Sequence, residues 1–320
     1  AMISNKTVLI LGAGAHIPYG FPSGKRLMGN VVDQLFRARQ DSNLSLYTLP
    51  SKGDVNIDIV QQKNVDRFME SLNQAGQASI DSFINANQHM TGFDVIGKVG
   101  IAQSILEAEA KFLIARNSNK DNKYDWFEYL FEKMCDGVVK SNHFLRDNNV
   151  SFITFNYDRL LEQKFFNALK HSFNLENDQK VLELVKAIPI YHVYGSLGEY
   201  DPNGFGQINY WTSTYKSIQT IHEVIAEHSA AVKSARQQLE QAEKICLLGF
   251  GYHRENIELL ELSRMIEQIN SNVVACRFGV TDEEMRRVTL SNRLRERKLE
   301  MGSKDENALD TLRNRQAFDS

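Results

Sequence analysis

The sequence predicts an α/β protein with a doubly wound, mostly parallel, Rossmann-like sheet and a helical insertion after the first β-α unit. Short apolar runs that suit buried strands alternate with helical patterns along much of the chain, as in parallel sheets. Four of these runs are followed directly by glycine-rich or polar residues, which is where parallel sheets bind their ligands. The 320 residues are enough for one large domain or two small ones.

The first strand is expected at residues 7–11, an apolar run that ends at Gly12. A loop with two prolines follows, and Ser23 can then cap a helix over residues 24–38. Residues 40–65 are polar and irregular, whereas the pattern over 65–139 is mostly helical.

Further strands are predicted in the second half of the chain, separated by helices. They are expected at residues 150–155, 188–193, 244–250 and 272–278, with one long amphipathic helix over 217–242. The sheet domain should therefore comprise residues 1–39 and 146–281. Residues 40–145 should form the helical insertion or small domain, and 282–320 a helical tail.

Composition narrows the classes of function. The net charge is −3, and no basic patch suggests a nucleic-acid partner. No segment reads as a membrane span or a secretory signal, which predicts a cytoplasmic protein. The three cysteines, Cys135, Cys246 and Cys276, are far apart in apolar surroundings, so we expect reduced, buried thiols and no metal site.

The first motif, at residues 12–16, consists of Gly12, Ala13, Gly14, Ala15 and His16. Glycines after a first strand let the backbone approach a pyrophosphate closely. The third glycine of the usual dinucleotide fingerprint is absent, and a longer loop precedes the helix, which disfavours an ordinary dehydrogenase. A tight turn without a ligand is the alternative.

Polar side chains end the next two strands. Asn156 and Asp158 place an amide and a carboxylate two residues apart, although Asp158 could simply cap the following helix. His192 ends the next strand and is followed by Gly195 and Ser196. A histidine at such a position can act as a base near neutral pH, but a lone histidine is more often structural.

The fourth motif lies at the end of the strand expected over residues 244–250. Gly249 and Gly251 suit another close approach of the backbone to a ligand, and His253 and Asn256 come shortly after them. Taken alone, a plain turn explains this motif about as well.

In this order, the motifs resemble those of the sirtuin family. The matching segments are Gly12-Ala13-Gly14, Gly20-Phe21-Pro22, Asn156-Tyr157-Asp158 and His192-Val193-Tyr194-Gly195-Ser196. In detail they look closer to the sirtuin-like domains of bacterial anti-phage systems, and residues 79–83 look like the start of the helical insert in that branch. Those domains hydrolyse NAD to nicotinamide and ADP-ribose.

Three features depart from the protein deacylases of the family. The zinc cysteines are missing, and Ser23-Gly24-Lys25 replaces the Asp-Phe-Arg that follows Gly-x-Pro. His16 stands where a small hydroxyl residue is usual. The first two departures argue against a peptide deacylase, and the third concerns the contact of the loop with phosphate.

The resemblance implies NAD as substrate and a role for each motif. Asn156 would hold the water and the ribose hydroxyls, His192 would be the base, and Asp158 would lie by the nicotinamide carboxamide. The remaining expected NAD-binding residues are Gly12, Ala13, Gly14, Ala15, His16 and Pro22, then Gly195 and Ser196, then Gly249, Gly251, His253 and Asn256.

Three other functions stay open from the sequence. The pocket could bind NAD or ADP-ribose as a sensor without turnover, the protein could be a deacylase, or the site could be vestigial in an interaction protein. Because an NAD-destroying enzyme must be restrained, we also expect a homo-oligomer or a partner protein of a defence system.

Overall fold

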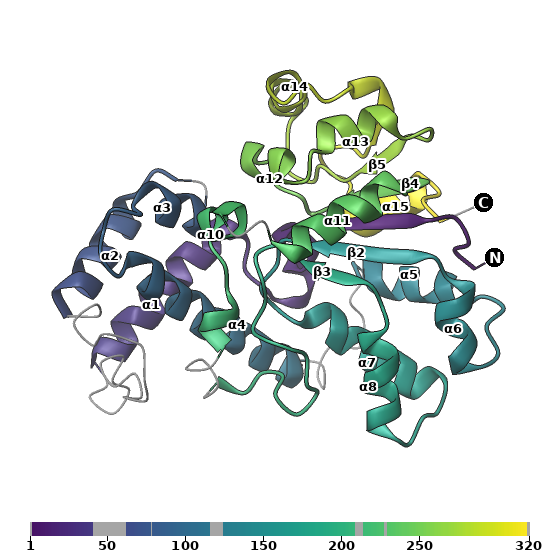
Figure 1. Cartoon of the computed structure of the whole chain (residues 1–320), viewed down its shortest axis with the longest axis horizontal. Helices are drawn as coiled ribbons and strands as arrows, with labels where there is room; N and C mark the ends of the chain where they lie inside the picture. The colour runs from purple at the N-terminus through teal and green to yellow at the C-terminus, as the bar shows by residue number, and fades with distance from the viewer. Residues whose placement is uncertain are drawn as a thin grey trace.

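Six parallel strands form one sheet in the computed structural model, which describes residues 2–40, 62–77, 79–115, 124–208, 214–226 and 229–318 (Figure 1). The order across the sheet is β3-β2-β1-β4-β5-β6. The strands are β1 (Thr7–Leu11), β2 (Val150–Thr154), β3 (Ile190–His192), β4 (Lys244–Leu248), β5 (Val273–Ala275) and β6 (Leu299–Met301). The predicted α/β class with a Rossmann-like parallel sheet is thus confirmed.

The central strand β1 fixes the position of the functional edge. All five of its residues are buried, and it pairs with β2 on one side and β4 on the other. The order of strands reverses between β1 and β4, and ligands of open α/β sheets bind at such a reversal.

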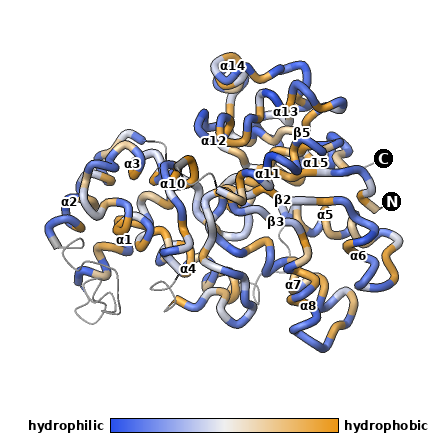
Figure 2. Tube along the Cα trace, in the orientation of Figure 1, coloured by the Kyte–Doolittle hydropathy of each residue, from blue (hydrophilic) through white to orange (hydrophobic). Residues whose placement is uncertain are grey.

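Helices cover both faces of the sheet. Alternate residues of each strand point to opposite sides, so the apolar residues of β1 are buried on both faces. Val8 and Ile10 face a core shared with α11 (Ala230–Glu240), α12 (Arg254–Leu259), α13 (Leu262–Gln268) and α14 (Asp282–Ser291). Leu9 and Leu11 face a second core. That core includes α5 (Trp126–Cys135), α6 (Ser141–Asp147), α7 (Leu160–Ser172), α8 (Asp178–Lys186) and α15 (Ala308–Asn314). Figure 2 shows hydrophobic and hydrophilic residues alternating along these helices, as amphipathic packing requires.

A helical lobe lies beside the sheet, on the left in Figure 1. It consists of α1 (Gly24–Gln40), α2 (Gln62–Gln74), α3 (Ile80–Ala86), α4 (Phe93–Ala115) and α10 (Ile221–Ala226). Helix α4 packs against α1, α2 and α3, and α10 contacts α3. The buried Lys98 of α4 also pairs with Glu223 of α10, Nζ to Oε1, at 2.5 Å.

The packing partners of three helices differ from the division expected from the sequence. Helix α1, placed in the sheet domain, packs within the helical lobe, whereas α5 and α6, placed in the insertion, pack on the sheet. Amphipathicity shows that one face of a helix is buried, but not what buries it. Most of the polar stretch 40–65 lies outside the described residues, and α2 already begins at Gln62.

Two further segments differ from the sequence prediction. The single helix expected over 217–242 is wrong: the described residues there form α10 and α11, with Ser229 as the N-cap of α11. The tail 282–320 is not helical throughout, since β6 pairs in parallel with β5 and extends the sheet. Within the described residues, no helix is long and apolar enough to cross a membrane.

Candidate functional site

The register of the sheet brings the ends of four strands into line. Leu11 of β1 lies opposite both Thr154 of β2 and Leu248 of β4, and Thr154 in turn lies opposite His192 of β3. Each of the four sequence motifs begins at one of these positions or within two residues after it. The motifs therefore meet at one edge of the sheet, beside the reversal of strand order.

The glycines of the first and fourth motifs pack against each other. Gly249 has a φ of +57°, and a Cβ added there would lie 1.8 Å from the Ala15 nitrogen. A Cβ on Gly12 would lie 2.4 Å from the Gly249 carbonyl oxygen. Only glycine fits at these positions, because the two backbones touch.

The amide groups of the first loop are used mostly within the protein. Gly12 donates to the Leu248 carbonyl and Gly14 to the Gly249 carbonyl, each at 3.0 Å. The Ala15 and His16 amides donate back to Gly12 and Ala13, at 3.0 and 3.1 Å. In this conformation the amides of Gly12 and Gly14 are therefore bonded to protein carbonyls, whereas the sequence analysis assigned them to a pyrophosphate.

Two short 3-10 turns connect the first motif to α1. They span Ala13–Ala15 and Ile17–Tyr19, and Gly20 ends the second turn with a φ of +89°. The Trp126 indole donates to the Ala15 carbonyl at 2.7 Å, which fixes the first turn against α5. This longer route explains why the dinucleotide fingerprint fails here, since α1 begins only at Gly24.

Asn156 lies at the centre of the site. Its side chain donates from Nδ2 to the Gly12 carbonyl at 3.2 Å, so that it links the ends of β2 and β1. Its own amide donates to the Thr154 hydroxyl at 3.1 Å, and the residue is 6% exposed. The side-chain oxygen Oδ1 has no donor within the described part of the chain.

Asp158 pairs with His16, which the sequence analysis found in an unusual position. The Nδ1 atom of His16 lies 2.9 and 3.1 Å from the two Asp158 oxygens, and both residues are buried. Asp158 also accepts from the Leu160 amide at 3.1 Å, at the start of α7. Asp158 thus binds the first amide of α7, although the N-cap residue of that helix is Arg159, and His16 contacts both carboxylate oxygens.

His192 contacts a residue that the sequence analysis did not identify. Its Nδ1 lies 2.9 Å from the Asn156 carbonyl oxygen, and its Nε2 lies 2.8 Å from Glu162 Oε1. Burial of the ring disfavours its charged form, but Glu162, the Asn156 carbonyl and Asp158 outweigh burial and raise the pKa of His192 above its ordinary value. Glu162 lies in the first turn of α7, where nothing in the sequence pattern distinguishes it from a solvent-exposed carboxylate.

Gly195 and Ser196 lie in the turn that follows His192, where the Gly195 amide donates to the His192 carbonyl at 3.2 Å. Gly195 has a φ of +70°, and a Cβ there would lie 2.0 Å from the Ser217 carbonyl oxygen. Gly195 bridges to Ile218, and the Ser196 hydroxyl donates to the Gly198 carbonyl at 3.0 Å. These residues bring the segment before α10 to the site.

The fourth motif contacts the third motif, and the second motif contacts the helical lobe. The Tyr194 hydroxyl donates to Asn256 Oδ1 at 2.5 Å, whereas Gly251 and His253 are exposed. The Tyr157 hydroxyl donates to Asp81 of α3. Burial raises the pKa of Asp81, and the nearby His253 acts in the opposite direction. The segment 79–83, noted in the sequence, thus contributes a carboxylate beside the second motif.

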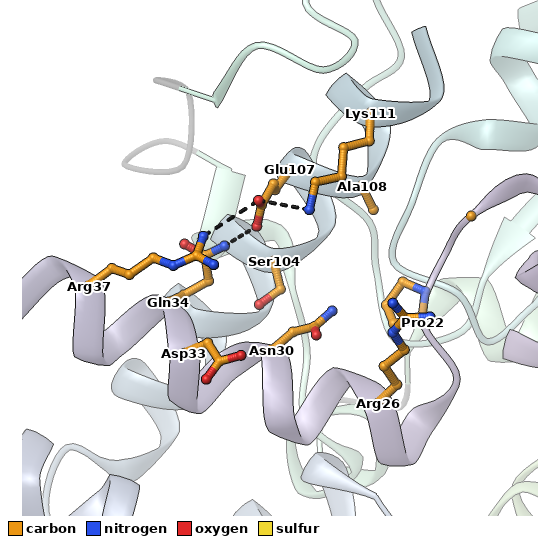
Figure 3. A pocket seen from close by; sticks show the side chains of 11 residues that line it. Pro22, Arg26, Asn30, Asp33, Gln34, Arg37, Ser104, Glu107, Ala108 and Lys111 are labelled. Atoms are coloured by element: carbon orange, nitrogen blue, oxygen red, sulfur yellow. Dashed lines mark hydrogen bonds and ion pairs between the residues drawn. The ribbon is translucent and has the colours of Figure 1, made fainter. Parts of the chain in front are cut away.

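Pro22, which the sequence analysis placed among the NAD-binding residues, lines a polar pocket between α1 and α4 (Figure 3). The pocket has a volume of about 120 Å³. Glu107, one of the two acidic residues that line it, accepts from Gln34 and pairs with Arg37 at 3.6 Å and with Lys111 at 2.9 Å.

Part of the chain that carries these motifs matches a known family of protein domains. Residues 150–297, a little under half of the chain, match the model of the SIR2-like domain. The match begins at β2 and contains the second, third and fourth motifs. No curated protein matches the chain. The matched region thus supports a sirtuin-like assignment and, with it, an NAD-dependent function.

Proposed function

We propose that this protein is an NAD glycohydrolase that cleaves the nicotinamide–ribose bond of NAD and releases nicotinamide and ADP-ribose. The observation that carries the proposal is the meeting of four strand-end motifs, with Asn156 at their centre, beside the reversal of strand order. The SIR2-like match over three of these motifs supports NAD as the substrate.

The reaction requires little acid catalysis. The bond between the ribose C1′ and the nicotinamide nitrogen breaks with its electron pair on nitrogen, so nicotinamide leaves as a neutral ring. The transition state resembles an oxocarbenium ion, as in glycoside hydrolysis. Water then adds at C1′ and loses a proton. The protein must therefore supply position, charge stabilisation and a held water molecule.

Asn156 suits the task of holding water or a ribose hydroxyl. Its Nδ2 atom is fixed by the Gly12 carbonyl, so its orientation is set by the protein. The Oδ1 atom, which has no donor in the described residues, can accept a hydrogen bond from water or a hydroxyl group. An amide does so without changing its charge with pH.

The cysteines favour hydrolysis over deacylation. A sirtuin deacylase builds its acyl-lysine groove between the sheet domain and a zinc module. Cys246 lies in β4 and Cys276 directly follows β5, and both are buried in the core. Neither is placed to belong to such a module. In this protein the helical lobe occupies the space beside the sheet instead (Figure 1).

A sensor of NAD or ADP-ribose is the second candidate, and the burial of the site favours it. Asn156 is 6% exposed and Asp158 is 4% exposed, with His16 bonded to the latter. In this conformation these atoms are largely covered by the protein. A sensor would bind the nucleotide and release it intact.

We further propose that the enzyme serves bacterial anti-phage defence, on the strength of its likeness to that sirtuin-like branch. Depletion of NAD is toxic, so activity would be controlled by assembly into a homo-oligomer or by a partner protein. The closed network around Asp158 agrees with a resting state of low activity.

Chromatography of the products distinguishes these functions. Purified protein is incubated with NAD, with and without an acetyl-lysine peptide, over a range of protein concentrations. Nicotinamide and ADP-ribose in equal amounts without peptide support the hydrolase, and an increase in specific activity with concentration supports control by assembly. Nicotinamide release only with peptide supports a deacylase, and bound but intact NAD supports the sensor.

A further inference from the structure

We infer that Glu162 is a positioning residue that holds His192 in its doubly protonated form and so sets when His192 can accept a proton. The part of this inference that concerns catalysis rests on the proposed NAD cleavage. The part that concerns the protonation of His192 does not.

The geometry around the ring carries the inference. Both contacts of the His192 imidazole are with acceptors: the Asn156 carbonyl oxygen at Nδ1, 2.9 Å away, and the Glu162 carboxylate at Nε2, 2.8 Å away. A neutral imidazole has only one N–H donor, whereas the imidazolium ion has two. Only the imidazolium ion satisfies both contacts as hydrogen bonds while Glu162 is ionised.

Glu162, in turn, is largely buried, and His192 is its charged partner. The two side chains are 12% and 13% exposed, respectively. The second oxygen of Glu162, Oε2, is buried without a hydrogen-bond partner in the described part of the chain. A buried carboxylate needs a compensating charge, and the His192 ring supplies it.

The surrounding charges do not replace this pairing. Asp158, in the loop between β2 and α7, favours a charged His192 ring but is itself bonded to His16. Tyr200, after β3, lies close enough to sense the charge of Glu162, and its hydroxyl donates to Gln163. Arg159 points to Glu109 of α4, in a separate buried ion pair at 2.6 Å.

The pairing has a consequence for the reaction. An imidazolium ion has no free lone pair, so His192 cannot act as a base in this conformation. It instead holds the Asn156 peptide by its carbonyl, which fixes the residue that binds water or ribose. The base role becomes available only after the proton shared with Glu162 has left the ring.

The test is the titration of His192 in the full chain by NMR of labelled histidine side chains, with His192→Gln identifying the signal. Glu162→Gln keeps a hydrogen bond to Nε2 but removes the charge, and we expect it to lower the pKa of His192 by about one unit, a tenfold loss of proton affinity. Glu162→Asp, which retains a more distant charge, should give a smaller shift. Glu176→Gln, at an exposed position beyond the same helix, is the matched control and should give none. The same His192 pKa in Glu162→Gln and wild type would overturn the inference.

The pH profile of NAD cleavage then tests the catalytic part. The acidic limb of the rate should move to lower pH in Glu162→Gln together with the NMR titration, and stay in place in Glu176→Gln. If the acidic limb of the rate stays in place although the NMR titration moves, the positioning role is overturned. Wild-type protein that cleaves no NAD contradicts the proposed function, but the NMR comparison still decides the protonation of His192.

Discussion

Replacing Gly249 with alanine should separate the two glycine loops at the centre of the site. The new Cβ would meet backbone atoms, 1.8 Å from the Ala15 nitrogen and 2.3 Å from the Gly14 carbonyl carbon. Backbone atoms cannot rotate away, so one loop must shift. A left-handed conformation costs an alanine about 1–2 kcal/mol, and overpacking adds about 1–3 kcal/mol. We expect Gly249→Ala to lower the free energy of unfolding by about 2–5 kcal/mol.

Gly137→Ala is the matched control for this prediction. Gly137 has a φ of +82°, and a Cβ there would meet nothing within 4 Å. This variant should lose only about 1–2 kcal/mol for the left-handed conformation. Urea unfolding of both variants and wild type measures the difference. Equal losses in the two variants would refute the reasoning that the Gly249 and Gly14 backbones must touch.

Three more predictions concern the two histidine–carboxylate contacts. His192→Ala should lower the free energy of unfolding by about 3 kcal/mol, because it leaves Glu162 buried without its partner. A double variant that also carries Glu162→Gln should recover most of this loss in urea unfolding. No recovery in the double variant would argue against the pair. The folded-state pKa of His192 is raised, so the stability from this pair is fully present below the unfolded value of about 6.5 and is lost as the pH rises through the folded value. The unfolding free energies of wild type and His192→Gln should therefore converge as the pH rises above neutral, and a gap that does not depend on pH would contradict this sign. His16→Ser should remove the histidine contact from the Asp158 oxygens and lower the free energy of unfolding by about 1–3 kcal/mol. Because the carboxylate is then open to a ligand, NAD should bind more tightly in calorimetric titration. Unchanged affinity would show that the contact does not close the site.

The strand ends could be predicted from the sequence because each combines two local signals. An apolar run marks a buried strand, and the glycine or polar residue after it marks the edge of the sheet. The bounds of β1 agree with the prediction, and Asn156 and His192 lie at the same edge, as expected. The strand β6 carried no such signal, since its three residues include the polar Glu300.

The contacts within the site could not be predicted, because they depend on how distant segments pack. His16 and Asp158 are 142 residues apart in the sequence, and Tyr157 and Asp81 are 76 apart. Glu162 is one of many helical carboxylates until β3 places His192 beside it. The sequence also indicated glycines suited to a close approach, but not that another loop of the protein would be what approaches them.

The most direct test of the central claim is NAD turnover by wild type and Asn156→Ala at equal concentration, with the products separated by chromatography. We expect nicotinamide and ADP-ribose from the wild type and at least a hundredfold less from the variant, on the order of the loss of one group that acts on the transition state. Thermal melting of both proteins shows that the variant is folded. Equal turnover in two folded proteins, or intact NAD with the wild type at every protein concentration, would contradict it.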